Sequence, residues 1–162
     1  MTQYRLKLNV RLDLSRLLNV DRYQKSNQPK LLDIAADRYL RYLRNRYISL
    51  SAGGGEWPDL TDSTIKSKAW RGIADNPSAI LREYDLLLNS MGKVIRGKEI
   101  YVGYTSNRQH PRGISIFQLV RIHSKGEGRV PKRRVIGLPN QQTLKNMVND
   151  VRSRYNRIIR QR

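Results

Sequence analysis

Residues 53–68 read GGGEWPDLTDSTIKSK, and this stretch breaks one segment of helical pattern from the next. Its three glycines end a helix easily, because glycine adopts positive φ without steric cost. Trp57 precedes Pro58, and a residue before proline avoids the α region, so an extended turn follows. We therefore predict a fixed joint in which Trp57 acts as a wedge against the core.

Helical patterns flank the joint on both sides. Upstream, apolar residues recur at three- and four-residue steps over residues 30–49, which predicts a long amphipathic helix with a cationic outer surface. Downstream, Thr61 or Ser63 can cap a short helix that runs through about Lys68. The apolar stripe of the long helix consists of Leu32, Ala35, Tyr39, Leu43 and Tyr47.

Strand patterns occur at the start and in the second half of the chain. Residues 4–12 alternate apolar and polar without error, which predicts a strand with one covered and one basic face. Residues 93–97 and 99–104 flank a glycine turn and predict a hairpin. We also expect a short strand within residues 133–138.

Three further segments are assigned by periodicity. Residues 78–90 predict a helix, and residues 114–123 are compatible with either a strand or a helix. Asn140 can cap a final amphipathic helix over residues 140–160. The polar loops 105–113 and 124–134 are long and basic, and such loops often order against a neighbouring molecule.

Together these segments predict an α+β fold. A small antiparallel or mixed sheet would be packed by the helices near residues 30–49 and 140–160. The length of 162 residues fits one domain over residues 1–162. Within it, residues 30–160 form the core, and the strand and loop of residues 1–29 could reach a neighbouring subunit as an arm.

Net charge indicates the kind of partner. The chain carries +19, divided as +7 over residues 1–50, +1 over residues 51–110 and +11 over residues 111–162. Two basic flanks around a neutral middle attract polyanions or acidic protein surfaces. The chain has no cysteine, and its longest apolar run is far too short to span a bilayer, so we expect no membrane association.

Catalytic signals are weak. Only His110 and His123 titrate near neutral pH without assistance, and they lie in different segments without a metal-ligand spacing. The acidic residues of the middle segment lie mostly at helix starts, where they complement the helix dipole. The glycine run lacks the order of a phosphate-binding loop. We predict no enzyme activity, no cofactor and no metal.

Nucleic-acid binding stays open at this stage. Residues 38–47 interleave arginines with tyrosines, a combination that can bind phosphates and stack on bases. Tyr39 and Tyr47 fall on the apolar stripe, however, which makes them core residues, while Tyr42 lies at its edge. No helix-turn-helix, zinc-finger or aromatic-sheet motif is legible.

The joint resembles the "G-x-x-W-x-x-L-S-x-x-T-x-x-x-K" signature of the phage virion morphogenesis family, the tail-completion and neck proteins of tailed bacteriophages. The matching residues are Gly55, Trp57, Pro58, Leu60, Thr61, Thr64 and Lys68. Residues 80–91 are similar to the family's "ILxxTGxLxxSI" segment, and Val102-Gly103 to its "VG". Residues 122–126 and 130–138 resemble "IHQFGG" and "IPARPFLGL". Tyr84-Asp85 replaces Thr-Gly, and Arg134-Val135 replaces Pro-Phe.

The resemblance implies a structural role. A protein of this family is expected to form a homo-oligomeric ring of about six or twelve copies through heterologous contacts. It would be made in the host cytoplasm and located in the virion, at the neck or tail top, where it completes the tail or joins head to tail. Its partners would be neighbouring neck, connector or tail proteins.

The basic loop before the last helix is the expected contact surface of this ring. It would dock acidic patches of neighbours or touch the DNA path, through Arg129, Pro131, Lys132, Arg133 and Arg134. The competing interpretation is a small basic nucleic-acid-binding protein of the ribosome- or nucleoid-associated type. An adaptor for a packaging enzyme is a third option.

Overall fold

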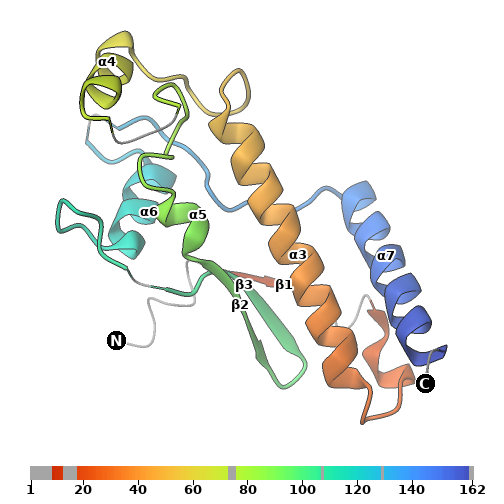
Figure 1. Cartoon of the computed structure of the whole chain (residues 1–162). Helices are drawn as coiled ribbons and strands as arrows, with labels where there is room; N and C mark the ends of the chain where they lie inside the picture. The colour runs from red at the N-terminus through yellow and green to blue at the C-terminus, as the bar shows by residue number, and fades with distance from the viewer. Residues whose placement is uncertain (1–8, 13–17, 73–75, 107, 129, 161–162) are drawn as a thin grey trace.

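The computed structural model describes residues 9–12, 18–72, 76–106, 108–128 and 130–160 (Figure 1). Short helices and a small sheet surround one long helix, with a second long helix beside it (Figure 1). The elements, in chain order, are β1 (Asn9–Leu12), η1 (Val20–Arg22), α3 (Gln28–Ser51), α4 (Asp62–Trp70), α5 (Leu86–Asn89), β2 (Met91–Arg96), β3 (Glu99–Tyr104), α6 (Ile116–Lys125) and α7 (Gln141–Arg160).

Helix α3 is the centre of the fold. Proline occupies its first turn, where the missing N–H costs nothing, and the helix continues without glycine until Ser51. Its predicted stripe is buried: Tyr39 and Tyr47 have no exposed surface, so both are core residues as expected. The other buried residues of α3 are Leu31, Leu32, Ala35, Ala36, Leu43, Leu50 and Ser51.

The sheet is antiparallel, with strand order β1-β3-β2. The predicted hairpin is confirmed, and Gly97 supplies the positive φ of 57° at its turn. Ile100, Val102 and Tyr104 alternate along β3 and are fully buried, and both β2 and β3 contact α3. β1 pairs with β3 of its own chain, which confirms part of the predicted strand, whereas residues 4–8 lie outside the described residues.

Helix α7 packs along α3 and begins as predicted (Figure 1). The side chain of Asn140 accepts a hydrogen bond from the N–H of Thr143 at 2.8 Å, which satisfies one free donor of the first turn. Asp150 then joins the two helices, because its carboxylate lies 2.8 Å from Arg38 Nε of α3 and 3.1 Å from Arg154 of α7. The buried residues of α7 are Met147, Val148, Val151 and Tyr155.

The segment that was compatible with either strand or helix forms helix α6. Ser115 and Gln118 make a capping box at its start, in which each side chain bonds the backbone N–H of the other. Gly126 ends the helix in the left-handed conformation at φ 73°. The sequence alternatives are therefore resolved by capping at both ends of the segment.

The predicted helix over residues 78–90 is wrong except for its last turn, α5. Leu81 and Asp85 have φ of 57° and 50°, and an α-helix cannot contain such left-handed residues. The backbone groups here bond elsewhere: Ile80 N–H donates to the carbonyl of Ser51 at 2.8 Å, and the carbonyl of Leu81 accepts from the hydroxyl of Tyr47 at 2.6 Å.

The predicted strand over residues 133–138 is also wrong, because this segment joins no sheet. It is irregular, yet its burial alternates: Arg133, Val135 and Gly137 are buried, and Arg134 and Leu138 are exposed. Side chains take the place of a neighbouring strand, since the carbonyls of residues 134 and 137 lie within hydrogen-bond distance of a Trp and a Tyr side chain. A covered extended segment and a strand give the same sequence pattern.

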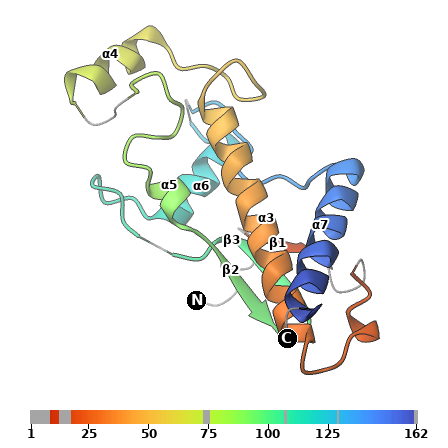
Figure 2. The same cartoon turned by 45° about the vertical axis from the view of Figure 1, so that its right-hand side comes forward.

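The fold class is α+β, as predicted, and one hydrophobic core contains residues from Leu18 to Tyr155. The hairpin is tied to α3 by Lys93, whose Nζ lies 2.6 Å from Asp33 and 2.7 Å from Asp37. The joint at the end of α3 carries α4 away from the sheet and away from α7, as both views show (Figures 1 and 2).

Candidate functional site

The predicted wedge lies where α3 ends. Trp57 is 2% exposed, and its ring meets Tyr47 of α3 edge-on, with centroids 5.5 Å apart. The indole Nε1 donates to the carbonyl of Arg134 at 3.3 Å, which gives the buried N–H a partner. Trp57 therefore holds both the end of the long helix and the segment that precedes α7.

Arg133 fastens the same place from the other side. Its guanidinium donates to the carbonyl of Pro58 through Nη2 at 2.8 Å and through Nε at 3.3 Å. Its backbone N–H donates to the carbonyl of His123 at 2.7 Å. Burial lowers the pKa of Arg133, and the charge of Asp59 acts in the opposite direction.

This position of Arg133 corrects part of the predicted contact surface. Its side chain is 4% exposed and lies inside the joint, so it is not available to a partner. Pro131, Lys132 and Arg134 are exposed, as a contact surface requires, and Arg129 lies outside the described residues. Alternation along the extended segment explains the difference, because successive side chains point to opposite sides.

Lys68 closes the joint from helix α4. Its side chain is buried, and Nζ donates to the carbonyl of Ala79 at 2.6 Å. Burial lowers the pKa of Lys68, because removal from water disfavours the charged amine, and nearby Glu83 partly restores it. The lysine of the signature thus binds α4 to the irregular segment before α5.

The remaining residues of the predicted joint shape the turn. Gly53 and Gly54 have φ of 88° and 70°, so they need glycine, whereas Gly55 does not. Thr61 caps α4 as predicted, accepting from the N–H of Thr64 at 3.4 Å. Leu60 packs against the core. A surface ion pair of 2.7 Å between Arg46 and Glu56 spans the turn.

Segments that are far apart in the sequence thus meet at the end of α3. The joint contacts residues 133–134 through Trp57 and Pro58, and it contacts residues 79–81 through Lys68 and Tyr47. In each contact a buried or half-buried side-chain donor binds a backbone carbonyl. This arrangement fixes the path of three irregular segments around one helix end.

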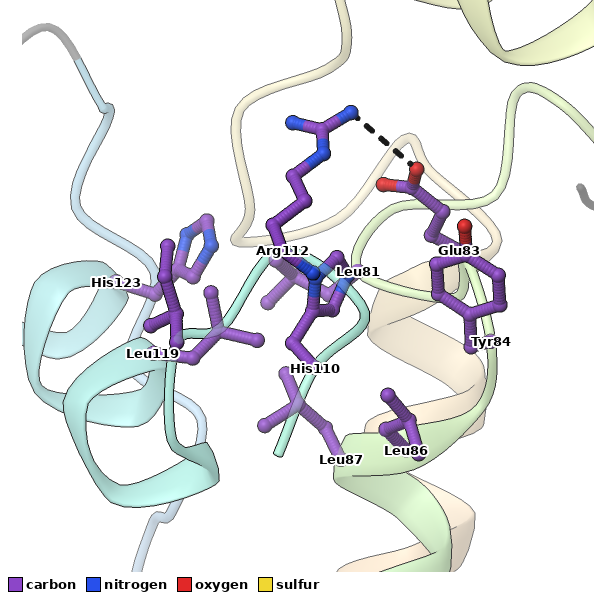
Figure 3. A pocket seen from close by; sticks show the side chains of 10 residues that line it. Leu81, Glu83, Tyr84, Leu86, Leu87, His110, Arg112, Leu119 and His123 are labelled. Carbon is purple, nitrogen blue, oxygen red and sulfur yellow. Dashed lines mark hydrogen bonds and ion pairs between the residues drawn. The ribbon is translucent and has the colours of Figure 1, made fainter. Parts of the chain in front are cut away.

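A pocket of about 190 Å³ lies beside the joint (Figure 3). Arg112 reaches over it to Glu83 at 3.5 Å, and the same carboxylate also binds Arg71. His110 meets the ring of Tyr84 edge-on at 5.2 Å. The pocket is lined by Leu81, Glu83, Tyr84, Leu86, Leu87, His110, Arg112, Ile114, Leu119 and His123.

The two histidines of the chain both reach this pocket, although they come from different segments. Burial lowers the pKa of His123 to about 4, and the nearby charge of Arg133 acts in the same direction. His123 is therefore neutral at physiological pH. Because the carboxylate of Glu83 is held by two guanidinium groups, the pocket offers apolar contacts and hydrogen bonds. Sequence reasoning missed this pairing, since the path of loop 105–113 sets it.

Over the described ranges, no cluster of three or more His, Cys, Asp or Glu side chains could hold a metal ion. None of the described helices is both long and apolar enough to cross a membrane. Comparisons with known protein families, curated proteins and solved structures gave no significant match.

Proposed function

We propose that this chain is a structural virion protein of a tailed bacteriophage, forming a ring at the neck or tail top that completes the tail or joins head to tail. The observation that carries the proposal is the meeting of the resembling blocks in space. Residues 55–68 bind residues 133–134 through Trp57 and residues 79–81 through Lys68. Motifs that are separate in the sequence thus serve one joint.

The chemistry of the joint supports a structural role. Its donors are the indole of Trp57, the guanidinium of Arg133, the amine of Lys68 and the hydroxyl of Tyr47, and each binds a backbone carbonyl. Such contacts hold segments in place. A ring needs copies of uniform shape, because a heterologous contact closes only if each subunit presents the same angle.

The charge distribution supports acidic partners. Most described carboxylates are already paired within the chain, including both that face Lys93 and the one that joins α3 to α7. The excess of +19 therefore remains largely uncompensated at the surface. Exposed Lys132 and Arg134 next to the joint are the groups we expect to dock on acidic neighbours.

Charge reversal tests this role. We expect Lys132→Glu with Arg134→Glu to fold normally, because both side chains are exposed, yet to yield unjoined heads and tails in the phage that encodes it. Electron microscopy of the particles is the measurement. Arg22→Glu with Lys25→Glu, two exposed positions far from the joint, is the matched control. Normal infectious particles from the first variant would contradict the docking role.

The uncompensated charge also favours a second candidate, a nucleic-acid-binding protein. Duplex DNA would then bind the isolated chain tightly, and the affinity would fall steeply with salt as counterions return to the phosphates. A salt titration separates the candidates. Salt-steep binding by a protein that never assembles supports nucleic-acid binding, whereas ring assembly with weak DNA binding supports the virion role.

A further inference from the structure

The most exposed large apolar side chain of the described residues is Trp70, at the end of helix α4. It is 88% exposed, whereas Trp57, the other tryptophan, is 2% exposed. A tryptophan left in water forgoes a large burial energy, and tryptophan is enriched at the centres of protein interfaces. Trp70 is therefore the first residue to consider for a contact with another molecule.

Helix α4 has the character of an arm. Lys68 is its only buried residue, and the nine residues of the helix are too few to be stable in isolation. The Thr61 cap and the Lys68 bond to Ala79 hold it to the joint. Both views place α4 on the opposite side of α3 from α7 (Figures 1 and 2).

A groove of about 650 Å³ runs along α7. Leu144 and Val148, one turn apart, form its apolar floor, and Lys145 stands at its rim. The groove is lined by Gln141, Leu144, Lys145, Val148, Asn149 and Arg152, all from this one helix. It is thus a helix face that no other described element lines.

We propose that Trp70 of one copy inserts into the α7 groove of the next copy. The inference rests on the proposed ring and names its contact. The two surfaces differ and lie on opposite sides of the chain, which is the geometry of a heterologous head-to-tail contact. The rigid joint fixes the direction of α4, so every copy offers Trp70 at the same angle.

Charge selects this pairing over the alternatives. The last third of the chain, which contains α7, carries +11, so two α7 faces repel each other. The middle segment that contains α4 carries only +1 and can approach α7 without that penalty. The indole also offers its negative ring face to the ammonium group of Lys145.

Fluorescence follows the insertion directly. In the Trp57→Phe variant Trp70 is the only tryptophan, so all indole emission reports the arm. We expect the emission to shift to shorter wavelength and to resist quenching by acrylamide as concentration rises and the chains assemble. Emission that stays that of exposed indole in assembled protein would overturn the inference.

Mutual rescue tests the contact with its partner surface. Trp70→Ala removes the arm contact, and Asn149→Phe fills the groove from an exposed position without disturbing the core. We expect about 30-fold or greater loss of self-association in each, measured by analytical ultracentrifugation. Mixed together they should form a one-to-one complex, because one chain keeps an intact groove and the other an intact arm.

Matched controls define the result. Asn156→Phe lies on α7 outside the groove, and Leu138→Ala removes an exposed apolar side chain outside both surfaces, so both should assemble as the wild type does. Rings of Trp70→Ala would overturn the arm contact and leave the ring function standing. Wild-type chains that stay single at every concentration would remove the support of both proposals.

Discussion

Arg133 and Pro58 lie 75 residues apart in the chain, and the guanidinium of the first donates two hydrogen bonds to the carbonyl of the second. A charged group that is nearly excluded from water requires such partners. The bond connects the turn after α3 with the segment before α7. It also explains why this arginine is inside the fold although its neighbours Lys132 and Arg134 are exposed.

Arg133→Met should destabilise the protein by about 1.5–3 kcal/mol, because it removes charge-assisted bonds and leaves the Pro58 carbonyl without its donor. The free energy of unfolding in urea measures this cost. Arg134→Met is the control, with an expected change within about 0.5 kcal/mol, since that side chain is exposed and its carbonyl still accepts from Trp57. Equal costs at the two positions would contradict the assigned roles.

Trp57→Phe should cost about 1–2 kcal/mol, since phenylalanine keeps the edge-on contact with Tyr47 but loses the indole bond to Arg134. Trp57→Ala should cost about 3–5 kcal/mol, because it adds a cavity at the end of α3. Thermal and urea unfolding of both variants provide the comparison. A Phe variant as unstable as the Ala variant would show that ring packing contributes little.

Two buried tyrosines allow a matched test of hydroxyl pairing. The hydroxyl of Tyr47 donates to the carbonyl of Leu81 at 2.6 Å, whereas the hydroxyl of Tyr104 has no hydrogen-bond partner among the described residues. Tyr47→Phe should therefore cost about 1–2 kcal/mol, and Tyr104→Phe should be neutral or slightly stabilising. Both are read from unfolding free energies. A larger loss at Tyr104 than at Tyr47 would contradict the assignment.

His123 should make stability fall in mild acid. Its pKa is lowered from 6.5 to about 4 by burial and by Arg133, so the unfolded chain binds the proton first as pH falls. This contribution is fully present above pH 6.5 and is lost as pH falls to about 4. We expect about 1–2 kcal/mol, because partial exposure reduces the full effect.

The pH dependence is measured by urea unfolding between pH 4 and pH 7. His123→Gln should remove this part of the slope, because glutamine does not titrate, whereas His110→Gln should keep it. Carboxylates contribute a background that all three proteins share. Identical slopes in the wild type and in His123→Gln would contradict the assigned burial effect.

Local patterns predicted most elements because those elements follow local rules. The stripe of α3, the Asn140 cap of α7 and the hairpin around Gly97 each depend on residues within a few positions of one another. The wedge role of Trp57 was likewise predictable, since glycines before a Trp-Pro pair impose a break and an extended turn.

Residues 78–90 show where such reasoning fails. Their apolar spacing fits a helix, but Leu81 and Asp85 take left-handed φ. The hydroxyl of Tyr47, the amine of Lys68 and the carbonyl of Ser51 supply hydrogen bonds that a helix would have made internally. Tertiary partners from other segments therefore override the local preference.

The order of residues alone determined that a long amphipathic helix, a small sheet and a cationic last third would form one α+β protein, because periodicity and charge are local properties. Only the tertiary structure decided that Arg133 is buried, that both histidines reach one pocket, and that Trp70 remains in water. Those outcomes depend on which distant backbone groups and side chains meet after the chain turns at residues 53–58. Sequence spacing does not encode that meeting, since it arises from packing around the end of α3.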